Sequence, residues 1–296
     1  MRKAPDATTT APTPTPAPQP RHATEHFRNP TLAQALFAVW SGDAAVVIDS
    51  PPGAGKTHLI TRLAHQLHTR AGMTVAVAAQ TRAQSIDVAN RTAATGARTV
   101  LHVDAEKERP RTLNPDVSVT NARHLQPGAG VIVATTARWL WMPLNRSTHF
   151  DVLLIDEAYQ LTFADLGALG SLADQFVLVG DPGQIAPVVT GATRRWDTST
   201  TGPQIPAPQA LIAAHSNDVA RLRLPQTWRF GPDTASLLAP LYPSLPLTPA
   251  RPPRHPTTAP HRLLHPNPHH HPPLPAKPPP PPPPPPRPPP PHPPPP

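Results

Sequence analysis

The chain contains 296 residues, including 50 prolines and no cysteine, and its formal net charge is +8. Without cysteine it has no disulfide framework and no thiolate metal site, and no apolar run is long enough for a signal sequence or a membrane-spanning helix. We therefore expect a soluble, cytoplasmic protein that does not contact a membrane.

Composition divides the chain into a central segment and two ends. Residues 1–24 are rich in Thr, Pro and Ala, and residues 247–296 are rich in Pro and His, so we predict a disordered leader and a disordered tail. Residues 25–246 are predicted to form one domain. Residues 31–245 contain 17 Lys and Arg and 16 Asp and Glu, a balance of +1 that leaves +7 for the two ends. Basicity is therefore no evidence that the folded domain binds nucleic acid.

Strand and helix patterns alternate along the central segment. Short runs rich in β-branched residues predict buried parallel strands at 44–49, 73–79, 151–156 and 175–180. Helical patterns occupy 56–70, 82–94 and 161–174, and residues 130–142 predict a further strand that runs into a helix. This alternation predicts an α/β fold, a parallel sheet with helices on both faces that binds ligands at the carboxyl ends of its strands. Residues 98–130 are polar and interrupted by prolines, and are predicted to be an irregular excursion from the sheet.

The first predicted strand leads into DSPPGAGKTHLI, residues 49–60, where a glycine-rich loop opens a helix. In a P-loop of this kind, backbone N–H groups and the helix N-terminus bind phosphates, Lys56 reaches the β- and γ-phosphates, and Thr57 binds Mg²⁺. Ser50 stands where the first glycine of the pattern belongs, and a turn that merely connects strand to helix is the alternative. We predict a P-loop NTPase that binds ATP and Mg²⁺ through Pro52, Gly53, Ala54, Gly55, Lys56, Thr57 and His58.

Two adjacent acids, Asp156 and Glu157, end the third predicted strand in LLIDEAYQ. A buried carboxylate is costly unless it is paired or binds a metal ion. We predict that Asp156 binds Mg²⁺, directly or through water, and that Glu157 is the base that polarises the attacking water. The alternative is a pair of solvent-exposed acids at a strand end.

The fourth predicted strand ends in LVGDPGQIAPV, residues 178–188. A P-loop, a DEA triplet followed by glutamine, and GDPGQ together resemble the motif series of superfamily 1 helicases, most of all the nonsense-mediated-decay group and its bacterial relatives. The resemblance implies a RecA-like lobe in which Gln184 contacts the γ-phosphate, while Gly180 and Asp181 shape a turn that couples the nucleotide to nucleic acid. A tight Asp-Pro-Gly turn without such a role is the alternative.

The same resemblance assigns roles to weaker patterns. Gln34 lies where the family has a glutamine that binds the adenine edge, although a solvated helix residue would look the same. Hydroxyls and cations after the second strand and in ATTARW, residues 134–139, suit contacts with the backbone phosphates of single-stranded DNA or RNA. Helix capping by Thr81 or Thr136 is an equal alternative. The nucleic-acid candidates are Gln80, Thr81, Arg82, Thr135 and Thr136.

The segment LPQTWRF, residues 224–230, resembles the fourth motif of the family. It implies that Arg229 stabilises charge on the γ-phosphate in the transition state, as an arginine finger does; a surface arginine stacked beside Trp228 is the alternative. The resemblance ends near residue 246 without a second lobe. We therefore expect an incomplete motor that acts with a separate second lobe, and a tail of the composition that an out-of-frame reading would produce.

The sequence thus predicts a helicase-type ATP hydrolase with Lys56, Glu157, Gln184 and Arg229 as its catalytic residues. Two other functions stay open. One is a non-enzymatic nucleotide-binding or interaction module whose proline-rich tail docks in an aromatic groove of a partner. The other is a P-loop phosphotransferase with a small-molecule acceptor.

Overall fold

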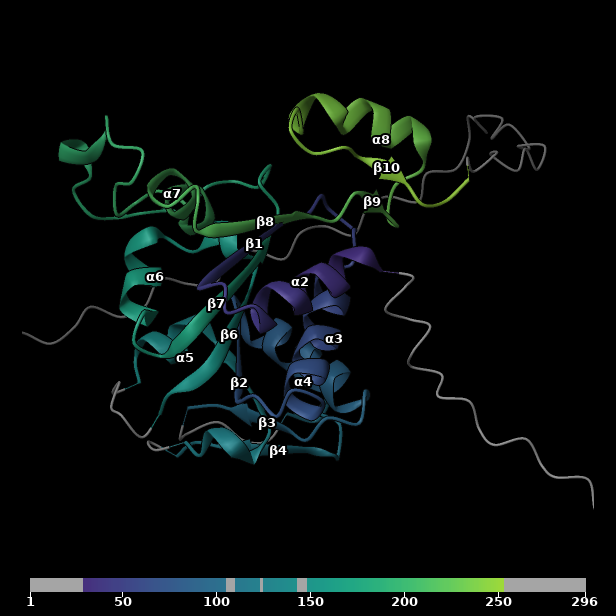
Figure 1. Ribbon diagram of the computed structural model, residues 1–296, viewed down its shortest axis with the longest axis vertical. Helices are drawn as coiled ribbons and strands as arrows, with labels where there is room; N and C mark the ends of the chain where they lie inside the picture. Colours follow the sequence, from purple (N-terminus) through teal and green to yellow (C-terminus); the bar gives the residue numbers. More distant parts are fainter. Residues whose placement is uncertain (1–28, 105–109, 123–124, 143–147, 253–296) are drawn as a thin grey trace, which may run out of the picture. The chain divides into compact units, whose positions relative to one another are not determined.

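The computed structural model describes residues 29–104, 110–122, 125–142 and 148–252. Its centre is an eight-stranded sheet in which all neighbouring strands are parallel (Figure 1). The strand order is β4-β3-β5-β2-β6-β7-β1-β8. The strands are β1 (Ala45–Asp49), β2 (Val75–Ala79), β3 (Thr99–His102), β4 (Val117–Thr120), β5 (Val131–Thr135), β6 (Phe150–Asp156), β7 (Ala173–Gly180) and β8 (Val219–Arg223).

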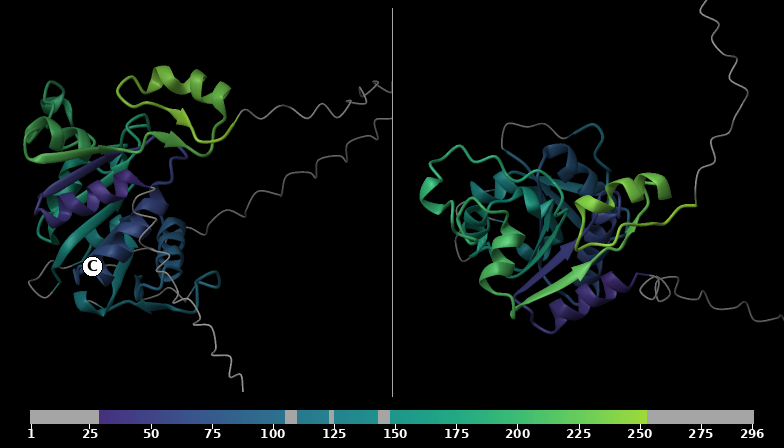
Figure 2. Two further views of the ribbon diagram at one scale, coloured as in Figure 1. Left: turned by 45° about the vertical axis from the view of Figure 1, so that its right-hand side comes forward. Right: turned by 90° about the horizontal axis from the view of Figure 1, so that it is seen from above.

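Helices cover both faces of this sheet (Figure 2), as the alternation of strands and helices predicts. One apolar core lies under α2 (Pro30–Trp40), α3 (Lys56–Thr69) and α4 (Arg82–Ala93). A second core, on the other face, lies under α5 (Thr136–Leu140), α6 (Phe163–Leu169) and α7 (Ala207–Ala214). Every residue of β1 and β2 is buried because these strands are covered on both faces. The predicted α/β fold with a parallel sheet is therefore confirmed.

The prediction that residues 98–130 leave the sheet is wrong. This segment contributes β3 and β4, and β4 is the strand at one edge. Both strands have only four residues, and Pro110, Pro115 and Pro127 all lie outside them. The two strands were missed because they are short and the segments that connect them contain prolines. In addition, β4 is half-exposed at the edge of the sheet, where polar residues are tolerated.

A second, two-stranded sheet follows the main one in the chain. It pairs β9 (Gln226–Thr227) in parallel with β10 (Thr248–Pro249), and α8 (Pro232–Leu238) lies between them in sequence. The N–H groups of Thr248 and Ala250 donate to the carbonyls of Pro225 at 3.0 Å and Thr227 at 2.9 Å. Regular structure thus continues beyond residue 247, where the tail was predicted to begin.

The rest of the predicted tail and the predicted leader lie outside the described residues. In the part of the chain that is described, no helix combines the length and the apolar character needed to cross a membrane.

Candidate nucleotide-binding site

The loop between β1 and α3 has the backbone conformation that its glycines allow. Gly53 and Gly55 have φ values of +74° and +93°, in the left-handed region that glycine adopts without strain. Ser50, in place of a further glycine, does not have a positive φ, and its N–H donates to the carbonyl of Gly180 at 2.9 Å. The entry turn therefore needs no glycine at residue 50, and the helix N-terminus at Lys56 opens toward the loop.

A cavity of about 520 Å³ lies at this loop. Five of the seven predicted P-loop residues line it; the carbonyl of Pro52 instead accepts a hydrogen bond from Thr227, and Ala54 is buried. Four cationic side chains and a single carboxylate surround the cavity, so it suits a polyanion. The lining residues are Gly53, Gly55, Lys56, Thr57, His58, Arg91, Glu157, Trp228, Arg229 and Arg251.

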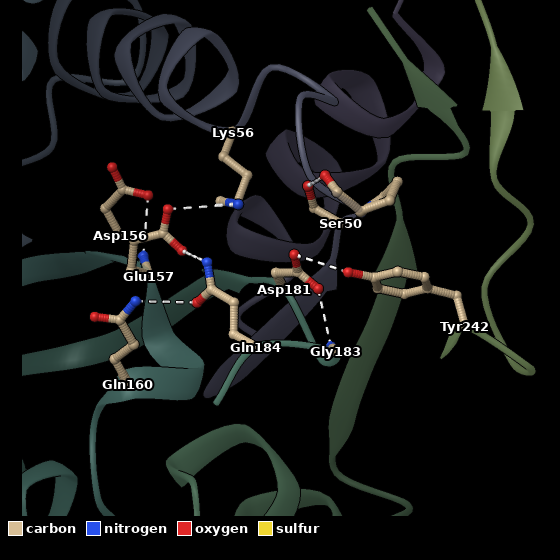
Figure 3. Close-up of polar contacts among 10 residues, drawn as sticks. Ser50, Lys56, Asp156, Glu157, Gln160, Asp181, Gly183, Gln184 and Tyr242 are labelled. Atoms are coloured by element: carbon tan, nitrogen blue, oxygen red, sulfur yellow. Dashed lines mark hydrogen bonds and ion pairs between the residues drawn. The ribbon is translucent and has the colours of Figure 1, made fainter. Parts of the chain in front are cut away.

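Three predicted catalytic side chains, Lys56, Glu157 and Gln184, contact one another (Figure 3), and the first two of them line this cavity. The Nζ of Lys56 lies 3.4 Å from Oε1 of Glu157, and Nε2 of Gln184 donates to Oε2 of Glu157 at 2.9 Å. Gln160 in turn donates to Oε1 of Gln184 at 3.2 Å. The carboxyl ends of β1, β6 and β7 are neighbours in the sheet, which brings these residues together from three separate motifs.

Glu157 is the only non-glycine residue of the described chain with a positive φ, at 55°. A left-handed conformation costs an L-residue about 1 to 2 kcal/mol, and such strain is concentrated at functional sites. The turn directs the Glu157 carboxylate toward Lys56 and Gln184 instead of along the strand.

The neighbouring acid, Asp156, is buried at the end of β6 with 3% of its surface exposed. Burial, and next the negative charge of Glu157, raise the pKa of the Asp156 carboxyl from 3.8 to about 6. Its Oδ1 accepts the N–H of Glu157 at 2.9 Å, and Lys56 pairs with Glu157. A buried carboxylate in this condition gains from a bound cation, and a carboxylate oxygen suits Mg²⁺, although Asp156 itself does not line the cavity. Among the described residues no group of three or more His, Cys, Asp and Glu could hold a metal ion unaided.

The GDPGQ turn is fastened to the segment that follows α8. Asp181 is buried and accepts the N–H of Gly183 at 2.9 Å and the hydroxyl of Tyr242 at 3.2 Å. Burial raises the pKa of the Asp181 carboxyl, and the two hydrogen bonds oppose that rise. A Cβ on Gly183 would lie 2.6 Å from the Tyr242 ring, so only glycine fits beneath it.

Arg229 lines the same cavity because its segment is fastened to the P-loop. The hydroxyl of Thr227 donates to the carbonyl of Pro52 at 2.9 Å, and the N–H of Trp228 donates to the carbonyl of Gly53 at 2.9 Å. Arg229 follows directly, and its own N–H donates to the Thr227 hydroxyl at 3.3 Å. The predicted proximity of Arg229 to the P-loop is thus found.

The nucleic-acid candidates are only partly brought together. Thr81 caps α4 through a capping box with Gln84, and α5 is capped by Thr135, not Thr136. Thr136 is buried as the first residue of α5, and Nε2 of Gln80 is buried without a hydrogen-bond partner among the described residues. Residues from both motifs line one small cavity near the ends of β2, β3 and β5. Among them is Arg138, the cation of ATTARW, and beside it His102, which sequence reasoning missed. The lining residues are Arg82, Ser85, His102, Val103, Asp104, Thr135 and Arg138.

The remaining candidate, Gln34, is exposed on α2 and does not line the nucleotide cavity. Arg91, Arg251 and Tyr242 are parts of the site that sequence reasoning missed. The only sequence feature that singled out Arg91 is its four-residue spacing from Asp87, which predicts an ion pair on a helix; the two are paired at 2.8 Å. Arg251 had no such feature, because it lies among the prolines that follow the predicted domain.

A P-loop at the carboxyl ends of a parallel sheet defines the class, a nucleotide-binding α/β fold of the P-loop type. The family model described as an AAA domain matches residues 31–204, and the chain belongs to this family.

The comparison with solved structures finds several helicases that are similar to parts of this chain. The arterivirus nonstructural protein 10 helicase in complex with DNA is 18% identical with a TM-score of 0.43, over 72% of this chain and 43% of that one. Pif1 from Bacteroides sp, with ADP-AlF4, is 16% identical with a TM-score of 0.35, over 66% and 41% of the two chains. The UvsW helicase of bacteriophage T4 is 15% identical with a TM-score of 0.40, over 63% and 57%. This chain thus spans less than two thirds of each, and no curated protein matches it significantly.

Proposed function

We propose that residues 30–246 form an ATP-binding and ATP-hydrolysing RecA-like lobe of a superfamily 1 helicase that acts with single-stranded DNA or RNA. The observation that carries this proposal is the Lys56–Glu157–Gln184 network, of which Lys56 and Glu157 line a cationic cavity. A base, a phosphate-binding cation and an amide that meet at the mouth of a P-loop are the parts that phosphoryl transfer to water requires.

Binding of the nucleotide rests on the P-loop. The backbone N–H groups at the start of α3 point to a site for anionic phosphates, and Lys56 would exchange its contact with Glu157 for the β- and γ-phosphates. Thr57 and Asp156 would hold Mg²⁺, which neutralises charge on the phosphate oxygens when bound. Half-exposed Trp228 adds an aromatic surface to the cavity wall.

Hydrolysis is assigned to Glu157, Gln184 and Arg229. A water oxygen bonds to the γ-phosphorus, the bond from that phosphorus to the β–γ bridging oxygen breaks, and Glu157 takes the proton, which leaves ADP and phosphate. The amide of Gln184 holds one carboxylate oxygen of Glu157 and leaves the other for water once Lys56 has moved to the phosphates. Arg229, at the cavity wall, offsets charge in the transition state.

Nucleic-acid binding is assigned to the cavity that Arg82 and Thr135 share. Both residues lie just beyond or at the carboxyl end of a strand, on the same edge of the sheet as the P-loop. A cation and a hydroxyl there suit a backbone phosphate and make no base contact. We further propose that strand separation requires a second lobe in addition to this one.

The test is ATPase activity of the full chain with and without single-stranded DNA and RNA. We expect Lys56→Ala to abolish ATP binding, and Glu157→Gln to keep binding and lose turnover. Equal ATPase rates in the wild type and Glu157→Gln would falsify the catalytic assignment. Wild-type binding without stimulated turnover would instead favour a nucleotide-binding module, and phosphate transfer to added nucleosides would favour a phosphotransferase.

A further inference from the structure

Arg251 reaches the nucleotide cavity from a part of the chain outside both the P-loop and the 31–204 family match. It directly follows the β10 segment, where the N–H groups of Thr248 and Ala250 are bonded to the β9 strand and its preceding residue. Pro249, which has no N–H to offer, lies between these two donors. Hydrogen bonds therefore fix the backbone as far as Ala250, the residue before Arg251.

The strand that holds Arg251 is itself held by the P-loop. Ala250 donates to the carbonyl of Thr227, and the hydroxyl of Thr227 donates to the carbonyl of Pro52. Two hydrogen bonds thus connect the backbone beside Arg251 with the phosphate-binding loop. Figure 1 shows β10 beside β9, as their pairing requires. The position of Arg251 at the cavity follows from this pairing and not from the adjoining sequence.

Two of the four cationic side chains that line the cavity are paired with a carboxylate and two are not. Lys56 is paired with Glu157 at 3.4 Å, and Arg91 is paired with Asp87 at 2.8 Å. Arg229 and Arg251 both line the cavity and form no ion pair with any residue in the described ranges. Two uncompensated guanidinium groups beside a P-loop call for a ligand with several negative charges, and guanidinium binds phosphate oxygens in a bidentate manner.

We propose that Arg251 is a second arginine that contacts the nucleotide phosphates, supplied by the same lobe as Arg229. The inference rests on the proposed function, since it takes the ligand to be a nucleoside triphosphate. It adds that this chain binds the phosphates between its P-loop and its own β9–β10 segment, before any second lobe is added.

The experiment measures ATP and ADP affinity of full-length Arg251→Ala, Arg251→Lys and wild type by equilibrium dialysis. Loss of a charge-assisted contact weakens binding about tenfold or more, and we expect the lysine variant to fall between alanine and wild type because it keeps charge and loses the fork. Arg194→Ala is the matched control, because Arg194 is exposed and lies outside the cavity lining. Unfolding of nucleotide-free protein in urea should be the same in all four.

Several outcomes would overturn the inference. If Lys56→Ala abolishes ATP binding and Arg251→Ala binds like wild type, Arg251 has no phosphate contact and the proposed function stands. If the wild type binds no ATP, both ideas fail. If Arg251→Ala weakens binding of a single-stranded oligonucleotide but not of ATP, the ligand class is wrong. If Arg251→Ala lowers the free energy of unfolding of the nucleotide-free protein by as much as it weakens ATP binding, Arg251 supports the fold and does not contact the phosphates.

Discussion

The N–H of Trp228 donates to the carbonyl oxygen of Gly53 at 2.9 Å, across a sequence separation of 175 residues. This bond fastens the segment that carries Arg229 to the tip of the P-loop. Gly53 has a φ of +74°, and a Cβ on it would collide with the Cβ of Arg229. The P-loop and Arg229 therefore pack so closely that only glycine fits at residue 53.

From this contact we predict that Gly53→Ala is strongly destabilising and loses ATP binding. The left-handed φ alone costs an alanine about 1 to 2 kcal/mol, and the collision would also separate Trp228 from Gly53. Gly72→Ala is the control, because Gly72 has a φ of +69° with nothing within 4 Å of its Cβ position. Urea unfolding should show a loss at least about 1 kcal/mol larger for Gly53→Ala. Equal losses would show that the loops are not packed together as described.

Asp156→Asn is predicted to stabilise the nucleotide-free protein while it removes the proposed Mg²⁺ ligand. Burial and the nearby Glu157 raise the pKa of the Asp156 carboxyl to about 6, so its folded-state pKa exceeds its unfolded value. Folding therefore disfavours the ionised form of Asp156. This destabilisation is absent below pH 4, where the carboxyl is protonated in both states, and is complete above pH 6, where it is ionised in both. Asparagine keeps an oxygen for the Glu157 N–H. We expect a gain of up to about 3 kcal/mol at pH 8 that disappears at pH 4; a gain independent of pH would contradict this explanation.

A buried histidine is expected to make the fold acid-sensitive. Burial, and next the charge of Arg138, lower the pKa of His102 from 6.5 to about 4. Its Nε2 accepts from Nε of Arg138 at 2.8 Å, so the neutral ring with a proton on Nδ1 is the form that fits, donating to the carbonyl of Thr120. The unfolded chain binds the proton more readily between pH 6.5 and 4, so stability falls as the pH falls through that window.

His102→Gln keeps an acceptor and removes the titration, so its stability should lack this decline, which amounts to at most about 3 kcal/mol in the wild type. His149→Gln serves as a control, because the pKa of His149 is shifted in the opposite direction to that of His102. A hydrogen bond to the Ser171 carbonyl, and next one to Asp174, raise the pKa of His149, so its contribution is present at low pH and lost as the pH rises. The same decline in wild type and His102→Gln, measured by urea unfolding from pH 7 to 4, would assign the acid sensitivity to another group.

Tyr242→Phe is predicted to loosen the GDPGQ turn. The Tyr242 hydroxyl donates to Oδ2 of buried Asp181 at 3.2 Å, and phenylalanine would leave that oxygen without this partner at a cost of about 1 to 3 kcal/mol. The loss should shrink at low pH, where Asp181 is protonated, because the hydrogen bond stabilises the carboxylate. We expect turnover to fall as well, since Gln184 belongs to the same turn. Tyr159→Phe is the comparison: it likewise leaves Oδ1 of buried Asp49 without its partner at 2.7 Å, while Oδ2 keeps Arg221 at 3.3 Å, so a stability loss of similar size is expected.

The sequence alone determined the fold class and the positions of the candidate site residues along the chain. The P-loop, Asp156 with Glu157, and GDPGQ each directly follow a buried apolar strand, and parallel strands place their carboxyl ends at one edge. Local patterns were therefore sufficient to predict that Lys56, Glu157 and Gln184 lie close together. Arg229 was identified by a motif, although its bond to the P-loop is not a local feature.

Only the tertiary structure decided which other residues complete the cavity. Prolines in the loops concealed β3 and β4, and proline content placed Arg251 in a tail, because composition describes a segment and not what pairs with it. Tyr242 and Arg251 reach the site through hydrogen bonds to residues more than twenty positions away. Such contacts depend on how β9 and β10 pair and on how the GDPGQ turn packs. No periodicity or spacing in the chain encodes that arrangement locally, since it arises only when distant segments are packed together.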